Sequence, residues 1–299
     1  MDRRSWLLGA ALLPLVGCAQ TGVEKNRAQA TQQLQAALGR VERRVGGRLG
    51  VAVLDTGSDA LATYRGDERF ALCSTFKLLL AGQVLQRADQ GLERLDARVR
   101  YGREDLVEYS PRTEPHAGGA GMTVAELCEA TMVLSDNSAA NLLLRRQGGP
   151  AGLTAWLRTL GDSHTRLDRI EPALNDVPAG ELRDTTTPRA MVHTVQKLVL
   201  GDALSCEARA RLQGWLLGNL TGDKRLRAGM PAGWRIGEKT GTANGTNGTS
   251  NDVGVVWPEG GAPAVVACYL TQCPAAPAQR DAAIAEVGSL AAAWLAAAG

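Results

Sequence analysis

The chain has 299 residues, of which 44% are hydrophobic and 21% are charged, and 33 basic against 31 acidic residues leave a formal net charge of +2. This composition excludes a disordered chain, because there are enough apolar side chains for a large core. The small net charge argues against a general nucleic-acid binder. The length fits one large domain or two lobes. The lysines are few: Lys25, Lys77, Lys197, Lys224 and Lys239.

The N-terminus has the pattern of a bacterial export signal. Arg3 and Arg4 precede an apolar stretch over residues 6–19 that is too short to span a bilayer, and the arginine pair suggests the twin-arginine route. Leu15-Val16-Gly17-Cys18 resembles a lipoprotein box, the alternative being an ordinary cleavage site with an incidental cysteine. We therefore expect a signal peptide over 1–17 and a periplasmic protein anchored to a membrane by lipid on Cys18.

The remaining cysteines and the histidines give no sign of a metal site. Five further cysteines are an odd number, so at least one thiol stays unpaired even in an oxidising compartment. No Cys-x-x-Cys or cysteine–histidine spacing typical of zinc is present, and the chain has three histidines. We expect no metal and no cofactor.

The predicted elements place strands at both ends of the chain and helices between them. An amphipathic helix is expected over 23–45 and a helical series over 75–218, before a final alanine-rich helix over 278–298. The strands are expected over 48–55, 61–64, 234–242, 253–257 and 264–271.

This order predicts an α+β fold with two lobes and an active site between them. One lobe, about 23–66 and 231–299, holds a five-stranded, mostly antiparallel sheet flanked by the N- and C-terminal helices. The other lobe, about 67–230, is expected to be all-helical. Together they form one catalytic domain over 18–299.

Ser74 and Lys77 stand at the start of the apolar run 78–85, which predicts a helix. Residues three apart share one helix face, so the amine can reach the hydroxyl. The helix N-terminus supplies N–H groups suited to a developing oxyanion, and a serine needs a nearby base to become a nucleophile. The alternative is that Ser74 only caps the helix and Lys77 is solvated.

Two further motifs favour the catalytic interpretation of Ser74 and Lys77. Ser135-Asp136-Asn137 lies at a break between helical stretches, where a helix cap is the alternative. Lys239-Thr240-Gly241-Thr242 lies in a predicted strand, where a glycine permits close approach of a ligand and an edge-strand lysine is the alternative. In this order, Ser-x-x-Lys, Ser-Asp-Asn and Lys-Thr-Gly resemble the active-site signature of the serine β-lactamases and penicillin-binding proteins.

The segment from Arg169 to Asn175 points to class A within that superfamily. It resembles the Glu-x-x-x-Asn segment of the class A Ω-loop, with Glu171 and Asn175 in the two positions. A carboxylate and a carboxamide four residues apart can hold one water, as ester hydrolysis requires; a helix-surface pair is the alternative. The resemblance also implies that Arg169 and Asp184 form the ion pair that closes the neck of the loop, rather than two solvated charges.

The resemblance covers the chain from about residue 30 to the C-terminus and implies further substrate-binding residues. Tyr109 would edge the cleft and Asn137 would bind the amide of the substrate's side chain. The substrate carboxylate would be bound by Thr240, Thr242 and Arg225. Many relatives use an arginine in the loop corresponding to 244–250, which has none here, so Arg225 resembles the alternative arginine; a surface charge is the other interpretation.

Two cysteines depart from the family pattern. Many members pair the cysteine at the place of Cys128 with one where Gly82 stands here, so Cys128 is expected to be unpaired. Some carbapenem-hydrolysing members join a cysteine at the place of Cys73 to one where Ala243 stands here. That disulfide cannot form, which makes a carbapenemase less expected without excluding it.

The resemblance implies a β-lactamase, a hydrolase that opens the cyclic amide of penicillins and cephalosporins and confers resistance. Ser74 would form an acyl-enzyme, with Lys77 or Glu171 acting through water as the base, a choice that the sequence leaves open. Ser135, assisted by Lys239, would protonate the leaving nitrogen. The backbone N–H groups of Ser74 and Thr242 would form the oxyanion hole.

Deacylation separates this enzyme from its two rivals. A water activated by Glu171 and oriented by Asn175 would release the product. A cell-wall D,D-peptidase would instead cleave D-Ala-D-Ala peptides, and a lipid-anchored β-lactam sensor would bind the drug without turnover. We expect a monomer that acts on a small-molecule β-lactam and binds no nucleic acid.

Overall fold

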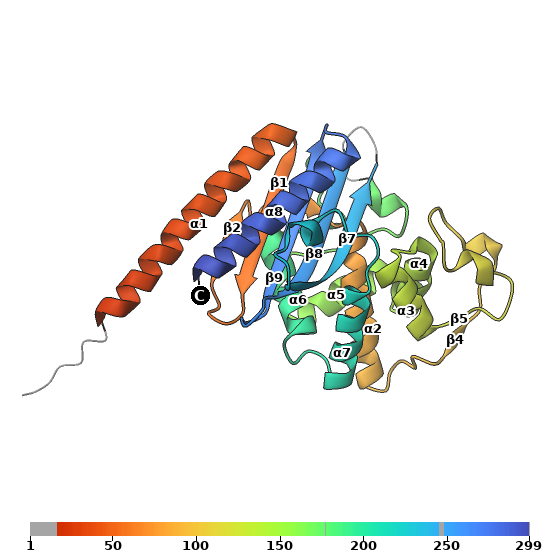
Figure 1. Cartoon of the computed structure of the whole chain (residues 1–299). Helices are drawn as coiled ribbons and strands as arrows, with labels where there is room; N and C mark the ends of the chain where they lie inside the picture. The colour runs from red at the N-terminus through yellow and green to blue at the C-terminus, as the bar shows by residue number, and fades with distance from the viewer. Residues whose placement is uncertain (1–16, 177, 245–247, 299) are drawn as a thin grey trace, which may run out of the picture.

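The computed structural model describes residues 17–176, 178–244 and 248–298, with side chains from 25 to 297 within these ranges. One five-stranded sheet has helices on both faces, and further helices pack beside it (Figure 1). The strand order is β2-β1-β9-β8-β7, and every neighbouring pair is antiparallel. The predicted α+β fold with a five-stranded sheet is confirmed.

The sheet joins the two ends of the chain. Its strands are β1 (Arg48–Asp55), β2 (Leu61–Tyr64), β7 (Arg235–Ala243), β8 (Gly248–Trp257) and β9 (Ala264–Cys273). The register pairs β1 with β9 along its whole length, from Arg48 opposite Thr271 to Asp55 opposite Ala264. The edge strand β7 lies next to β8 on one side only, so its other edge is available to form a wall of a site.

Strand β8 is longer than the sequence predicted. The prediction began at Val253, because Thr249-Ser250-Asn251-Asp252 is polar and follows a glycine-rich stretch, as a loop would. In the structure these polar residues are buried and continue the ladder, with Ser250 opposite Thr242 of β7 and Leu270 of β9. Pairing on both sides satisfies their backbone groups, so tertiary context overrides the polar pattern.

Side chains of the central strands alternate between two cores, as the period of two in a strand requires. Leu49, Val51 and Val53 of β1 pack in the outer core with α1 (Gly17–Val45) and α8 (Pro277–Ala298). Ala52 and Leu54 of the same strand belong to the inner core with the remaining helices. Both faces of the sheet are therefore buried.

The two terminal helices lie side by side across the outer face of the sheet (Figure 1). The indole N–H of Trp294 donates to Thr31 Oγ1 at 3.0 Å and ties the end of α8 to α1. In the part of the chain that the structure describes, no helix is both long and apolar enough to cross a membrane. Residues 1–16 of the predicted signal and the side chain of Cys18 lie outside the described parts.

Within the described residues, six further α-helices complete the domain. They are α2 (Phe76–Asp89), α3 (Val124–Val133), α4 (Asn137–Arg146), α5 (Gly149–Thr159), α6 (Pro188–Val199) and α7 (Cys206–Leu217). Helix α2 is buried from Phe76 to Leu85, which explains why this stretch is mostly apolar. Helix α6 packs against β1 and β9 on the inner face of the sheet.

Short strand pairs accompany these helices, so this part of the chain is not purely helical. β4 (Arg98–Val99) pairs with β5 (Met122–Thr123), and β3 (Phe70–Ala71) pairs with β6 (Thr185–Thr186). Runs of two residues are too short to leave a periodic signal in the sequence. The β3–β6 pair connects the segment before Ser74 with the segment after Asp184.

Candidate active site

A cavity of about 700 Å³ lies between the edge strand β7 and the helical part of the chain. Its lining residues come from distant parts of the sequence: Ser74, Glu108, Tyr109, Ser135, Asn137, Pro172, Asn175, Asp176, Pro178, Thr221, Thr240, Thr242, Ala243, Asn244 and Thr249. Seven of the predicted site residues are among them, so the fold gathers three separate motifs around one space.

Ser74 lies in a 3-10 turn, η1 (Cys73–Thr75), that runs directly into α2. The preceding Cys73 has a φ of 43°, a left-handed conformation that non-glycine residues rarely adopt and that clusters at functional sites. One turn later the side chain of Lys77 is fully buried. Its Nζ donates to Ser135 O at 2.8 Å and to Asn137 Oδ1 at 2.5 Å.

Glu171 connects the serine to the lysine. Its Oε1 accepts from Ser74 Oγ at 3.2 Å and lies 3.1 Å from Lys77 Nζ, while Oε2 accepts from Asn175 Nδ2 at 2.6 Å. Burial lowers the pKa of Lys77, and the charge of Glu171 opposes this shift. A buried lysine with a lowered pKa can serve as a free amine more readily than an exposed one.

Asn141 holds the backbone of Glu171, and sequence reasoning missed it. Its Oδ1 accepts from Glu171 N at 3.0 Å, and its Nδ2 donates to Glu171 O at 2.9 Å. Asn141 lies one turn after Asn137 on α4, so both asparagines face the same side of the helix. That spacing was the signal that could have found it.

The Ser135-Asp136-Asn137 motif serves as a helix cap and lines the cavity as well. Asp136 is the N-cap of α4 and accepts from Ala139 N at 2.8 Å. Ser135, with a φ of 61°, and Asn137 both line the cavity. Asn137 Nδ2 donates to Glu108 O at 2.8 Å, which ties the segment bearing Tyr109 to this motif.

On β7, Lys239 approaches Ser135 from the opposite wall. Lys239 Nζ donates to Ser135 Oγ at 3.1 Å, and Lys77 Nζ donates to the same oxygen at 3.3 Å. Burial, followed by the charge of Lys77, holds the pKa of Lys239 well below its ordinary value. A Cβ at Gly241 would lie 3.2 Å from Ser74 N and 3.0 Å from Leu72 O, a tight contact that glycine avoids where β7 approaches the nucleophile.

Arg225 stands behind β7 rather than in the cavity lining. Its Nη2 donates to Thr242 Oγ1 at 2.7 Å, and its Nη1 donates to the carbonyls of Gly241 and Asn251. Its Nε donates to Asp281 Oδ1 at 2.8 Å. Four of its five N–H groups therefore donate hydrogen bonds. Among these bonds, the one to the Thr242 hydroxyl is the one made to a side chain that lines the cavity.

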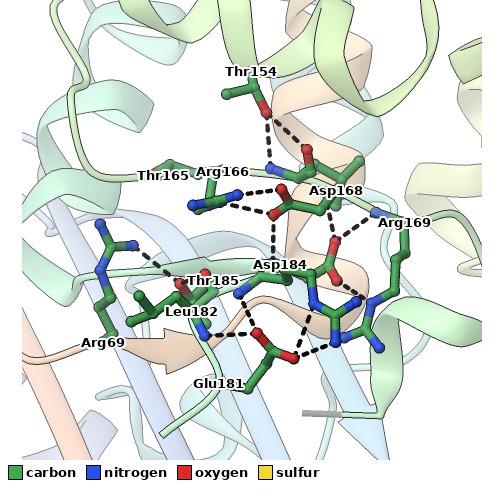
Figure 2. A network of polar contacts seen from close by, with 12 residues as sticks. Arg69, Thr154, Thr165, Arg166, Asp168, Arg169, Glu181, Leu182, Asp184 and Thr185 are labelled. Carbon is green, nitrogen blue, oxygen red and sulfur yellow. Dashed lines mark hydrogen bonds and ion pairs between the residues drawn. The ribbon is translucent and has the colours of Figure 1, made fainter.

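The segment that carries Glu171 closes on itself through carboxylates (Figure 2). Asp184 is fully buried; its Oδ1 accepts from the backbone N–H groups of Asp168 and Arg169, and its Oδ2 accepts from Arg169 Nε at 2.6 Å. Arg169 Nη2 donates to Asp176 O, farther along the loop. Arg169 and Asp184 thus join the two ends of the segment.

The described cysteines are all free thiols: Cys73, Cys128, Cys206, Cys268 and Cys273. Cys128 is unpaired, as expected, and Gly82 lies against Leu198 instead of against a second cysteine. Among the described side chains, no group of three or more His, Cys, Asp or Glu gathers as metal ligands would.

The sequence and the fold both match known proteins. Residues 29–295 match the model of the beta-lactamase enzyme family. The chain is 53% identical to Beta-lactamase FAR-1 from Nocardia farcinica, over 76% of this chain and 72% of that protein. An ancestral class A β-lactamase structure superposes with a TM-score of 0.84 at 62% identity, covering 86% of this chain and 98% of that one. The chain belongs to the class A β-lactamases.

Another relative is the carbapenem-hydrolysing β-lactamase KPC from Klebsiella oxytoca, 48% identical over 89% of this chain and 88% of that protein. Membership of the class A β-lactamases means that the chain is a hydrolase of β-lactams and a resistance enzyme. Class A β-lactamases are in general exported to the periplasm.

Thr221, a lining residue that sequence reasoning missed, hydrogen-bonds to Thr240 through its hydroxyl.

Proposed function

We propose that this class A β-lactamase hydrolyses penicillins and cephalosporins through an acyl-enzyme on Ser74 and a deacylating water activated by Glu171. The observation that carries the proposal is the position of one carboxylate oxygen. Glu171 Oε1 is within hydrogen-bonding distance of both Ser74 Oγ and Lys77 Nζ. A single base beside the nucleophile can serve both the formation and the breakdown of an ester.

In acylation, Ser74 Oγ would attack the strained carbonyl and lose its proton to Lys77 or, through water, to Glu171. Both bases fit the geometry. The backbone N–H groups of Ser74 and Thr242 would stabilise the oxyanion, and one such donor typically contributes about 3 to 4 kcal/mol. Ser135 would pass a proton to the leaving nitrogen, since its hydroxyl contacts both Lys77 and Lys239.

In deacylation, Glu171 and Asn175 would hold the attacking water. Asn175 uses its Nδ2 to fix Glu171 Oε2, whereas its buried Oδ1 accepts no hydrogen bond from the described residues and can accept one from a water. The carboxylate would then remove the water's proton as it attacks the ester, a step worth roughly 10²- to 10⁴-fold.

Substrate binding would use both walls of the cavity. Asn137 would bind the side-chain amide and Tyr109, which is exposed at the rim, would edge the ring system. Thr240 and Thr242 would bind the carboxylate. Arg225, which donates to the Thr242 hydroxyl, would attract the carboxylate by its positive charge. Because Cys73 is a free thiol and Ala243 stands where some carbapenem-hydrolysing members have its partner, we propose penicillins and cephalosporins as the substrates.

The test is the variant Glu171→Ala. Acylation should continue at least in part while deacylation stops, so a penicillin should remain on Ser74 and add its full mass to the intact protein. The matched control is Glu181→Ala in the same loop, because Glu181 does not line this cavity and should leave turnover near the wild-type rate. Normal steady-state turnover by Glu171→Ala would contradict the assignment.

We further propose that the mature chain is a monomer held to the membrane by lipid on Cys18. The lipobox-like sequence before Cys18 supports the anchor. Two or three acyl chains hold firmly, whereas one binds only marginally. In cells, Cys18→Ser should move the protein from the membrane fraction to the soluble periplasmic fraction, and an unchanged distribution would contradict the lipid. Light scattering on the soluble variant gives the mass of the monomer or refutes it.

A further inference from the structure

The backbone that leads into Ser74 is hydrogen-bonded to the sheet by one buried side chain, that of Asn251. Asn251 lies in β8 and is fully buried. Its Nδ2 donates to Ala71 O at 2.8 Å and to Leu72 O at 3.2 Å. Both carbonyl groups belong to the segment that enters the 3-10 turn of the nucleophile. The side chain of Asn251 therefore connects the position of this turn to the position of β8.

The same segment also packs against β7. Gly241 of β7 lies directly opposite Asn251 of β8, and a Cβ at Gly241 would lie only 3.0 Å from Leu72 O. The next residue of β7 is Thr242, whose backbone N–H is one of the two proposed oxyanion donors. The other donor, Ser74 N, lies two residues after Leu72. The way in which Leu72 is held on the sheet therefore sets the separation of the two donors.

A left-handed residue between Leu72 and Ser74 makes this attachment necessary. Cys73 has a φ of 43°, and such a conformation persists only where the surrounding structure fixes the chain. After the turn, the chain continues into the buried helix α2. Before the turn, Leu72 N donates to Asp184 O at 2.8 Å, and Leu72 O accepts from Asn251. Asn251 is the member of this set that lies in the sheet.

The carboxamide of Asn251 is oriented by these two carbonyl groups. Its Oδ1 is buried and has no hydrogen-bond partner among the described residues. A rotated amide would turn this oxygen toward two carbonyl oxygens, which cannot donate to it. Because a buried acceptor without a partner lowers the stability of a protein, packing alone does not account for an asparagine at this place.

We propose that Asn251 is a positioning residue of the reaction, which keeps the backbone N–H of Ser74 aligned with that of Thr242 by fixing Ala71 and Leu72 to β8. This inference rests on the proposed function, because it uses the oxyanion hole named there. Acylation and deacylation both form an oxyanion at the same place. Asn251 should therefore affect both steps, whereas Glu171 is required for deacylation.

The experiment compares the wild type with Asn251→Ala and Asn251→Thr. Threonine has nearly the volume of asparagine and suits a strand, but its hydroxyl is one bond closer to the backbone than Nδ2 and falls short of the two carbonyl oxygens. This variant keeps the test valid if Asn251→Ala does not fold.

The matched control is Gln83→Ala. Gln83 is also a buried carboxamide: its Nε2 donates to a backbone oxygen, Gly152 O, at 3.3 Å, and its Oε1 has no partner among the described residues. It lies on α2 and does not line the cavity. Its loss should lower stability without moving the oxyanion donors.

Three quantities are measured: the single-turnover rate of acylation by benzylpenicillin, the rate of decay of the penicilloyl-enzyme, and the Ki of phenylboronic acid. The tetrahedral adduct of this acid with Ser74 places an oxygen in the oxyanion hole. Both Asn251 variants should slow acylation and deacylation about 10- to 100-fold and raise the Ki at least tenfold, since a displaced donor costs less than the roughly 10²- to 10³-fold lost with a removed one. The KM should change little, because both steps slow together.

Gln83→Ala should leave all three quantities close to those of the wild type, and urea unfolding measures the loss of stability in each variant. A loss of stability in the Asn251 variants with unchanged rates and Ki would show a purely structural role and overturn the inference. Slower deacylation alone would also overturn it. Absence of benzylpenicillin turnover by the wild type would instead overturn the proposed function.

Discussion

The cleft has two walls that are held in different ways. The sheet wall is β7 backed by β8, joined by a continuous ladder from Arg235 opposite Trp257 to Ala243 opposite Thr249. The Ω-loop wall, residues 166–176 and 178–184, contains one 3-10 turn, η4 (Ala173–Asn175), and no longer helix or strand. Its shape depends on hydrogen bonds to the side chains of Asp168, Asp184 and Asn141.

The difference indicates how each wall responds to substitution. Many backbone hydrogen bonds hold β7 in place, and none of them depends on the identity of one side chain. The Ω-loop wall depends on a few carboxylates, so one substitution there can displace Glu171 and Asn175 together. A displacement of about 1 Å at reacting groups can cost on the order of 10²-fold in rate.

The largest effect is expected for Asp184→Asn. This change removes the charge of a fully buried carboxylate and leaves Arg169, whose side chain is 19% exposed, without its ionic partner, which costs about 3 kcal/mol in the free energy of unfolding. Deacylation should slow about 100-fold because the loop bearing Glu171 loosens. Urea unfolding and the decay of the penicilloyl-enzyme measure the two effects.

The matched control for that variant is Arg166→Ala. Arg166 also pairs with a carboxylate, Asp168, but its side chain is 40% exposed, and exposed pairs contribute about 1 kcal/mol or less. Equal losses of stability in Asp184→Asn and Arg166→Ala would refute the view that the buried pair holds the loop.

At the sheet wall, we expect an effect of pH on the free energy of unfolding, with little effect on deacylation. Asp252 of β8 and Glu238 of β7 are both fully buried, and burial followed by the charge of Glu238 raises the pKa of Asp252 well above its ordinary 3.8. The proton on Asp252 lets the two carboxyl groups hydrogen-bond to each other. Arg227 Nε donates to the other oxygen, Glu238 Oε1, at 2.8 Å.

The direction in which the free energy of unfolding changes with pH follows from proton binding. The folded protein binds the proton of Asp252 more tightly than the unfolded chain, so this stabilisation is complete below the ordinary pKa and is lost as pH rises through the raised pKa. The free energy of unfolding should fall with pH by at most about 1.4 kcal/mol per unit from this group. Asp252→Asn should flatten the slope between pH 5 and 9, and the exposed Asp202→Asn should not; equal slopes in all three proteins would contradict the raised pKa.

The sequence predicted the sheet and the terminal helices well because their patterns are local. Strands β1 and β2 lie at the predicted residues, since an apolar run bounded by turn residues is a short-range signal. The start of β8 could not be predicted in this way, because its polar residues become strand only through pairing with β7 and β9.

The candidate site was predictable where a motif is contiguous and not where tertiary contacts decide. Ser74 and Lys77 follow from spacing on one helix, whereas the clamp that Asn141 forms on Glu171 joins residues 30 positions apart. Left-handed φ values at Cys73, Tyr109 and Ser135 occur in residues that carry no such preference, so only the surrounding fold imposes them.

The pairing of β1 with β9 has a consequence for the order of folding. Leu49 lies opposite Leu270 in the sheet, so β1 cannot complete its pairing until a strand near the end of the chain is available. Such a contact must close nearly the whole polypeptide as a loop, which makes assembly of the sheet a late and slow event. During synthesis the edge of β1 that pairs with β9 therefore stays unpaired until β9 has emerged, and unpaired strand edges make folding intermediates prone to aggregation.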